Sequence, residues 1–276
     1  MRIVLWVCCI LAGAIASLWL FADTLRWLLD AWQTDPNYSH GLLAPFIAAF
    51  FFWRARAAFR GSARQPSAWG LGLLAGALGL HLLATPWRIY PLSALALIGA
   101  LAAGVWLLWG VPALRASAYA FISLLLMIPL PFIDRLSPML EAFTARIAGG
   151  FVSLLDAQVV ITGSQVQLPT AAFEIGAACS GLRSLASLLT LAVVFSGIVA
   201  GPRWGKLLIV CAAAPIAILA NLVRVSSILQ IAQAFGAGAG LAYYHDYSSP
   251  VLFLSAFALL ILFARSVHCA ELRLEG

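Results

Sequence analysis

The stretch FEIGAACSGLRSLASLLTLAVV, residues 173–194, begins with ionisable and nucleophilic side chains and then becomes almost wholly apolar. Glu174, Cys179 and Arg183 stand near its start, ahead of a run of leucine, alanine and valine. Such a run predicts a membrane-spanning helix, because about 20 apolar residues cross the hydrocarbon core of a bilayer. Ionisable side chains within or beside a span favour a functional role. The stretch therefore predicts a membrane fold with chemistry at one end of a helix.

The composition of the whole chain extends this prediction to the rest of the protein. Of its 276 residues, 63% are hydrophobic and 9% are charged, whereas soluble domains carry about 25% charged residues. Backbone groups within lipid must be hydrogen-bonded inside the span, so the spans are expected to be helices. We therefore predict an all-α polytopic membrane protein that forms a single integral membrane domain over residues 1–276.

Eight apolar runs are candidates for spans, and the first is expected to be a retained anchor because no clear cleavage site follows it. With the N-terminus in the cytoplasm, ten of the 16 Lys and Arg residues lie on the cytoplasmic side, as the positive-inside rule requires. Both termini are therefore predicted to be cytoplasmic, and the net charge of +6 is explained without a nucleic-acid partner. The runs cover residues 3–22, 39–53, 68–86, 92–111, 116–132, 180–200, 206–223 and 248–264.

One predicted external segment, residues 133–178, is long enough to form a small cap over the outer ends of the helices. Its first part, DRLSPMLEAFTARIAGGFVSLLDAQ, has apolar residues at helical spacing, which predicts an amphipathic helix at the membrane interface. The following VVITGSQVQLP alternates in polarity and contains Gly163 and Ser164 at a turn position. This pattern predicts a short β-hairpin that leads the chain toward Cys179.

Three polar segments come from three helix ends that the span count places at the same external level. They are ACSGLRS with Cys179, NLVRVSS with Asn221 and Arg224, and YYHDYSSP with His245. A thiolate is the nucleophilic form of cysteine and needs a nearby base or positive charge. His245 could accept the thiol proton and later protonate a leaving amine, and Arg224 could stabilise an oxyanion. The three segments together are compatible with covalent catalysis by Cys179.

Each of these residues also has an ordinary structural interpretation. Cys179 could pack as a small apolar side chain, Arg224 could extend from a helix end toward the interface, and His245 could be an interfacial loop residue. The five cysteines are odd in number, and their spacing predicts neither a disulfide framework nor a metal site. No cofactor is predicted. Pattern alone does not name the reaction, so a transporter of a glycan or lipid-linked intermediate is an alternative.

Four motifs, taken in order, resemble those of the exosortase/archaeosortase family of membrane cysteine transpeptidases, specifically its exosortase branch. The resemblance covers most of the chain, and the order and spacing of the motifs fit the family. The motifs are YSHG at Tyr38–Gly41, FEIGAACSGLRS at Phe173–Ser184, NLVRV at Asn221–Val225 and HDYSSP at His245–Pro250.

The resemblance implies that Cys179 is the nucleophile, Arg224 the transition-state stabiliser and His245 the acid and base. It also implies the substrate, a secreted protein whose C-terminal sorting signal combines a Pro-Glu-Pro-type motif, a transmembrane helix and a basic cluster. Cleavage near the motif would leave a thioacyl-enzyme that an unidentified acceptor resolves. The implied setting is the inner membrane of exopolysaccharide-producing Gram-negative bacteria, with the active site on the periplasmic side.

Four further residues are candidates for substrate contact or for support of the site: Arg183, Glu174, Asn221 and His40. Arg183 lies one helical turn after Cys179 and could orient the site, contact substrate or pair with Glu174. His40 precedes the second predicted span on the same external side, where it could equally be a helix-entry residue. A purely hydrolytic intramembrane protease would use the same three catalytic residues, so it is a second alternative.

Overall fold

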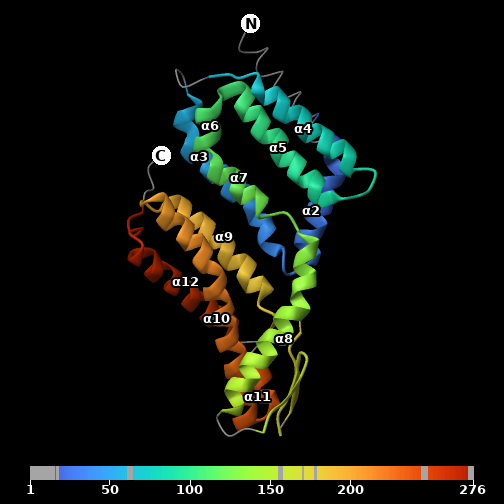
Figure 1. Ribbon diagram of the computed structural model, residues 1–276, viewed down its shortest axis with the longest axis vertical. Coiled ribbons are helices and arrows are strands. Elements are labelled where there is room, and N and C mark those ends of the chain that lie inside the picture. Colours follow the sequence, from blue (N-terminus) through green and yellow to red (C-terminus); the bar gives the residue numbers. More distant parts are fainter. Residues whose placement is uncertain are drawn as a thin grey trace. The chain divides into compact units, whose positions relative to one another are not determined.

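The computed structural model describes residues 16, 19–60, 65–154, 158–169, 171–176, 179–243 and 248–272, with only the backbone of residues 131–134 and 249. The chain forms two compact units, whose elements are labelled in Figure 1. The first is Met1–Pro129 with Glu275–Gly276, and the second is Leu130–Leu274. Both units contain apolar helices, and the single integral membrane domain stays a prediction.

The first unit is helical in its described part. Helices α4 and α5 lie side by side as an antiparallel pair (Figure 1). They approach closely, because a Cβ on Gly70 would lie 2.7 Å from the backbone nitrogen of Leu107, and small residues allow such approach between membrane helices. The elements are α2 (Ala22–Thr34), η1 (Ser39–Leu43), α3 (Ala44–Arg54), η2 (Ala55–Phe59), α4 (Trp69–Ala84), α5 (Tyr90–Trp109), α6 (Val111–Ala116) and α7 (Ala118–Leu125).

A buried group of polar side chains joins α2 to the α4–α5 pair. The Ser93 hydroxyl lies 2.6 Å from Thr24 Oγ1 and 2.7 Å from His81 Nδ1. All three side chains are buried, and the ring of Phe21 packs against the imidazole of His81. Buried polar groups are costly unless they are hydrogen-bonded. His81 therefore has a structural role in holding three helices together.

Helix α2 is an element that the sequence analysis did not predict. Its charged residues interrupt the apolar pattern, and Asp23 and Arg26 form an exposed ion pair at 3.2 Å. The buried face consists of Thr24, Leu28 and Trp32, which recur every four residues as one face of a helix does. Two apolar side chains and a threonine make too weak a pattern to reveal this helix beside the strongly apolar runs.

The YSHG motif lies at η1 and packs within the first unit. A Cβ on Gly41 would overlap the indole of Trp32, so only glycine fits at this position. The same indole donates a hydrogen bond to Met127 O at 2.9 Å, and His40 Nε2 lies 3.4 Å from Leu126 O. These contacts give the motif a packing role. A role of His40 in catalysis or substrate contact stays a prediction.

The second unit combines helices with a three-stranded antiparallel sheet of order β1-β2-β3. The sheet packs beside α8 at one end of the unit (Figure 1). The elements are α8 (Pro131–Ser153), β1 (Val160–Thr162), β2 (Gln165–Gln167), β3 (Ala172–Glu174), α9 (Leu182–Ile198), α10 (Arg203–Phe235), α11 (Ala237–Tyr243) and α12 (Ser249–Ser266).

Two hydrophobic cores divide the second unit into a helical bundle and a cap. The bundle core joins α9, α12 and the first half of α10 through Leu188, Ile209 and Leu260, which are fully buried. The cap core joins α8, the sheet and the second half of α10 through residues such as Val166 and Leu229. The cap that the sequence predicted is therefore a packed structure with a core of its own.

The amphipathic helix and the hairpin predicted for the cap are confirmed as α8 and β1–β2. On α8, Ile147 and Phe151 are 44% and 50% exposed, while the small residues Ala145 and Ala148 are fully buried in the cap core. An exposed apolar row on a helix suits the boundary between headgroups and acyl chains. The hairpin turns at Gly163, whose φ is +61°, the conformation that two-residue loops require. The third strand, β3, was not predicted.

Helix α10 is longer than the sequence analysis predicted. The predicted span ended at Val223 because polar residues follow it, but the helix continues to Phe235. Its 33 residues correspond to about 50 Å, against about 30 Å for the hydrocarbon core. The last turns stay helical because Val225, Leu229 and Ala232 are buried in the cap core. Arg224 therefore lies within a continuous helix and not at its end.

Only some of the predicted spans are long helices in the structure. Three helices are long and apolar enough to cross a membrane, and three shorter apolar helices accompany them. The predicted run 3–22 lies mostly outside the described residues, and the run 116–132 corresponds to the short helix α7. A mostly helical fold is therefore confirmed, and the number of eight spans stays a prediction. The long helices are Ser39–Phe59, Tyr90–Trp109 and Arg203–Phe235, and the shorter ones are Trp69–Ala84, Leu182–Ile198 and Pro250–Ser266.

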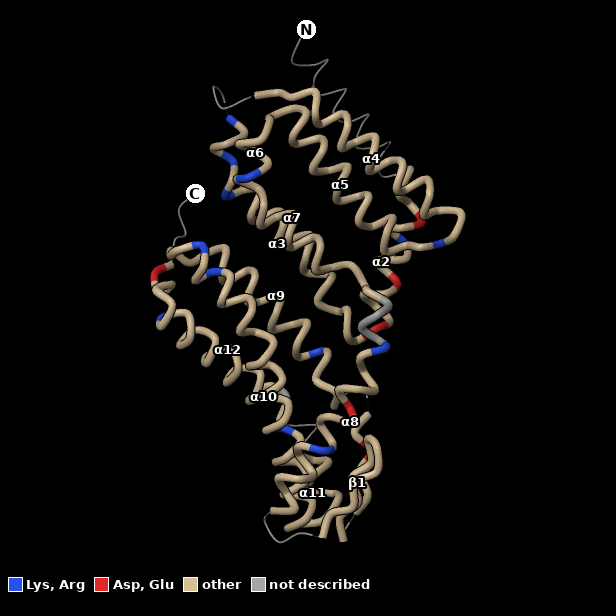
Figure 2. Tube along the Cα trace, viewed as in Figure 1, with Lys and Arg blue, Asp and Glu red and all other residues tan. Residues whose placement is uncertain are grey.

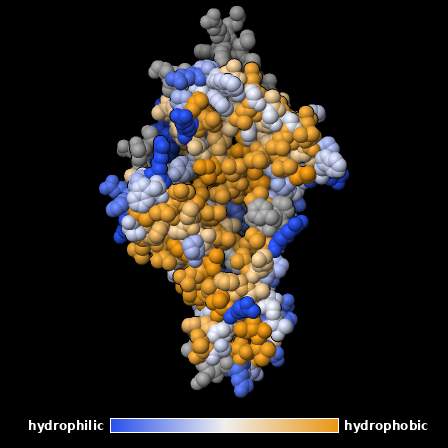
Figure 3. Space-filling view, viewed as in Figure 1, coloured by the Kyte–Doolittle hydropathy of each residue, from blue (hydrophilic) through white to orange (hydrophobic). Residues whose placement is uncertain are grey.

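Basic residues mark one end of the bundle in the second unit. Arg203 and Lys206 begin α10 and Arg265 lies near the end of α12 (Figure 2). These helix ends are held together by a β-bridge between Val199 and Leu272. Large hydrophobic side chains are exposed on the helices beyond this end (Figure 3), as expected for a surface in contact with lipid. The opposite end of the bundle carries the predicted site.

Candidate functional site

Cys179 lies where the chain passes from the cap to the bundle. Its backbone N–H donates to Gly176 O at 2.8 Å, which closes a turn after β3. Its side chain is half-buried and packs against the cap core. The helix α9 begins shortly afterwards, and the dipole of a helix N-terminus favours a thiolate over a thiol. The position therefore combines partial exposure of the thiol with nearness along the chain to a helix N-terminus.

Asn221 connects Cys179 to Arg224. Its side-chain Nδ2 donates to the backbone carbonyl of Cys179 at 2.9 Å, and its Oδ1 accepts a hydrogen bond from Arg224 Nη2 at 2.9 Å. A longer contact of 3.5 Å joins Nδ2 to Thr144 Oγ1 on α8. Asn221 and Arg224 are only 5% and 7% exposed. One buried amide thus fixes the backbone of the cysteine, the guanidinium and the cap helix relative to one another.

Gly181 allows the close approach that this arrangement needs. Its φ is +84°, a conformation that L side chains rarely adopt, and a Cβ there would lie 2.8 Å from Asn221 Cγ and Nδ2. Both the backbone conformation and the space therefore require glycine. The Ser-Gly pair after Cys179 in the sequence is explained by this contact between the start of α9 and the middle of α10.

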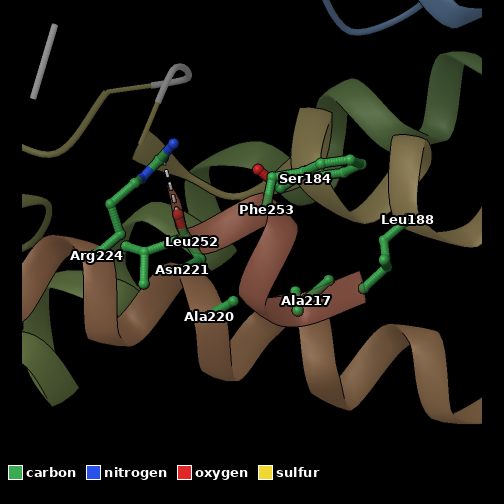
Figure 4. A pocket seen from close by; sticks show the side chains of 9 residues that line it. Ser184, Leu188, Ala217, Ala220, Asn221, Arg224, Leu252 and Phe253 are labelled. Atoms are coloured by element: carbon green, nitrogen blue, oxygen red, sulfur yellow. Dashed lines mark hydrogen bonds between the residues drawn. The ribbon is translucent and has the colours of Figure 1, made fainter. Parts of the chain in front are cut away.

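A pocket opens between α9, α10 and α12 beside this group (Figure 4). Its volume is about 20 Å³, enough for about one water molecule. Figure 4 shows Arg224 and Asn221 at one end and Leu188 and Ala217 at the other, so the pocket is polar at one end and apolar along the bundle. The lining residues are Ser184, Leu188, Ala217, Ala220, Asn221, Arg224, Leu252, Phe253 and Ala256.

Comparison with known proteins places this geometry in a family. The family model of the transmembrane exosortases matches residues 32–262, which include both Cys179 and Arg224. The chain belongs to the transmembrane exosortase family. No curated protein and no solved structure matches it. The resemblance found in the four sequence motifs is thereby confirmed.

In this exosortase-family chain, the structure brings together only some of the predicted site residues. Cys179, Asn221 and Arg224 are linked by hydrogen bonds, whereas His245 lies outside the described residues. Arg183 and Glu174 are both exposed. Among the described residues they form no ion pair with each other, and the roles considered for them stay predictions.

Two residues of the candidate site were not singled out from the sequence. Thr144 reaches Asn221 from α8, and Ser184 lines the pocket from α9. Thr144 precedes the two buried alanines of α8. The only sequence feature that could have indicated it is its place on the small-residue face of an amphipathic helix. Ser184 lies five positions after Cys179. Its place beside the pocket depends on α9 beginning at Leu182, and the sequence did not reveal that start.

The arrangement can support attack by a thiolate on a carbonyl. A negatively charged oxygen that forms near Cys179 would be close to a buried guanidinium, and such charges are stabilised most where water is excluded. Arginine stays protonated even when it is partly desolvated. The hydrogen bond from Arg224 to Asn221 fixes the orientation of the guanidinium before any substrate binds, so little reorganisation is needed during the reaction.

Proposed function

We propose that the protein is a membrane-embedded cysteine transpeptidase that cleaves the C-terminal sorting signal of secreted proteins and transfers them to an acceptor. The observation that carries the proposal is the link from the Cys179 carbonyl through Asn221 to Arg224. It joins the turn that carries the nucleophile to a buried cation. Acyl transfer needs such a pair, whereas a simple membrane anchor does not need it. Membership of the exosortase family supports the same class of reaction.

The proposed reaction has two halves. In the first, Cys179 Sγ attacks the carbonyl carbon of the scissile peptide bond, His245 takes the thiol proton, and Arg224 stabilises the oxyanion. The C–N bond then breaks, His245 protonates the leaving amine, and a thioester to Cys179 forms. In the second half, an amine acceptor attacks the thioester, which gives a new amide and restores the thiol. The role of His245 is taken from the sequence motif.

The proposed setting is the inner membrane, with both termini in the cytoplasm and Cys179 on the periplasmic side. The basic end of the bundle, with Arg203, Lys206 and Arg265, lies opposite the end that carries Cys179, and cytoplasmic ends carry the excess of Lys and Arg. The substrate is a secreted protein with a Pro-Glu-Pro-type motif, a transmembrane helix and a basic cluster. A scissile bond just outside that helix would lie at the level of Cys179.

Trapping of the thioester tests the proposed function. Hydroxylamine added to membranes that contain the protein and its substrate should release the substrate as a C-terminal hydroxamate, because hydroxylamine cleaves thioesters. Mass spectrometry of the product then identifies the scissile bond. Processing without any thioester would contradict the covalent mechanism. A free carboxylate as the only product, in the presence of the native acceptors, would identify a hydrolase, and the absence of any adduct or product would favour a transporter.

Asn221→Ala is expected to reduce processing by about 10- to 100-fold, as loss of the hydrogen bonds that orient ligands does at metal sites. The variant keeps Cys179 and Arg224 but removes the amide that fixes them. The rate of processing in membranes, normalised to the amount of protein, measures the effect.

The matched control for this variant is Ser227→Ala on the same helix. The Ser227 hydroxyl donates only to carbonyls of its own helix, at Val223 and Arg224, so its loss should leave the rate unchanged. Equal rates for Asn221→Ala and Ser227→Ala would show that the amide does not position the site. A loss of protein from the membrane in Asn221→Ala alone would instead indicate a role in folding.

A further inference from the structure

Strand β3 is an edge strand that leads directly to the nucleophile. In the order β1-β2-β3 it pairs only with β2, and Cys179 follows shortly after its last residue, Glu174. Among the described residues, no strand pairs with the other edge of β3. Free strand edges present backbone groups to which another chain can add as a further strand.

The hydrogen-bond pattern shows which backbone groups of β3 face this outer edge. Leu168 and Ala171 exchange both backbone hydrogen bonds, at 2.7 and 3.3 Å. Hydrogen-bonded pairs alternate with other pairs along an antiparallel ladder, so the next hydrogen-bonded pair is Val166 with Phe173, which lie opposite each other. The residues on either side of Phe173 therefore direct their N–H and C=O groups away from β2.

Those residues are Ala172 and Glu174, and both are exposed. Within the described part of the chain, neither makes a backbone hydrogen bond outside the sheet. They present two N–H and two C=O groups about 7 Å apart, which is the two-residue repeat of a strand. An open hollow of about 280 Å³ lies over one face of the sheet, and Ala172 and Glu174 line its β3 side.

This edge is within reach of Cys179. Gly176 lies two residues beyond Glu174, an extended distance of about 7 Å. Its carbonyl accepts the N–H of Cys179 at 2.8 Å. A peptide that pairs with Glu174 therefore needs about three further extended residues to bring a peptide bond to Cys179.

We propose that the outer edge of β3 binds the extended segment of the substrate that precedes the scissile bond, as a parallel added strand. The proposal rests on the proposed function, because it requires a peptide substrate at Cys179. The parallel direction follows from the chain itself. β3 leads to Cys179 and then into α9, and a substrate whose transmembrane helix follows its scissile bond runs in the same direction. Main-chain hydrogen bonds give such a site affinity for many sequences.

Proline substitutions on the edge test the proposal from the side of the enzyme. Ala172→Pro and Glu174→Pro each remove one outward N–H, and proline is tolerated on edge strands where the N–H is outside the ladder. Ala172→Val and Glu174→Gln are the matched controls, because they retain the N–H. We expect each proline variant to raise KM for processing by about 2- to 12-fold. The turnover number kcat should be retained, and Ala172→Val and Glu174→Gln should raise KM less than the proline variants do.

N-methylated substrates test the proposal with the protein unchanged. Synthetic substrates that carry one N-methyl group, at successive residues before the scissile bond, each lose one donor. Only alternate N–H groups of an added strand face β3, so KM should rise at every second residue. No effect, or the same effect at every residue, would overturn the proposal. Equal KM values for the proline variants and their controls would do the same.

Failure of the strand site can be told apart from failure of the proposed function. If the unmodified protein forms the thioester and processes substrate, while neither proline nor N-methyl groups change KM, only the strand site is wrong. If the unmodified protein forms no thioester with any substrate that carries a sorting signal, the proposed function is wrong and the strand site is rejected with it.

Discussion

Cys179→Ala is expected to abolish processing of the substrate while the protein stays in the membrane at its normal level. The thiolate forms the covalent bond on which both halves of the reaction depend, and loss of the nucleophile costs about 10⁶-fold in another covalent peptidase. Product should therefore fall below detection. The side chain is half-buried and the change removes one atom, so the fold should persist. Product and membrane-bound protein are measured in the same cells over time.

Cys211→Ala is the matched control for this prediction. Cys211 is exposed on α10, within the part of that helix that packs in the bundle, so its replacement should leave processing unchanged. Normal maturation of the substrate in Cys179→Ala cells that contain no second enzyme of this family would remove Cys179 from the mechanism. The ordinary interpretation of Cys179 as a small packing residue would then hold.

Arg224→Lys is expected to lower turnover by about 10²- to 10³-fold, the usual cost of losing one donor to an oxyanion. The guanidinium already donates to Asn221 at 2.9 Å, and its planar fork can direct a further N–H to the oxyanion at the same time. Lysine carries a compact charge on a flexible stem and can lose its proton when it is desolvated. Substrate binding should survive, so a substrate complex should still be recovered by crosslinking.

Arg203→Lys is the matched control, because Arg203 is an exposed arginine at the other end of the same helix. Lysine should replace it without loss, since both side chains extend easily to the membrane surface. Processing near the normal rate in both variants would show that Arg224 only anchors α10. The small exposure of Arg224, at 7%, argues against that outcome, because an anchoring side chain reaches water.

The sequence predicted those parts of the fold in which apolar and polar residues alternate with a clear helical or strand periodicity. The amphipathic pattern of α8 and the alternation around Gly163 gave the helix and hairpin of the cap. Helix α2 and the continuation of α10 past Arg224 were missed for one physical reason. In both, tertiary packing stabilises a helix whose own residues are partly polar, and such packing partners are distant in the sequence.

The candidate site was predicted less completely than the fold. The span count placed Cys179 and Arg224 at the same level of the membrane. The NLVRV motif contains Asn221 together with Arg224. The sequence did not reveal that the Asn221 amide bridges the two, because the bridge depends on where one side chain points and on the lack of a Cβ at Gly181. It also did not reveal the edge of β3, since β3 is too short to show an alternating pattern.

The unbroken course of α10 makes the protein sensitive to the lipid around it. The first half of helix α10, which contains Pro215, packs against α9 and α12, and its second half packs in the cap. Membrane helices tilt when their apolar length and the thickness of the lipid differ, and α10 contributes to both the bundle core and the cap core. The thickness of the surrounding bilayer should therefore affect the cap, with its β3 edge, together with the bundle.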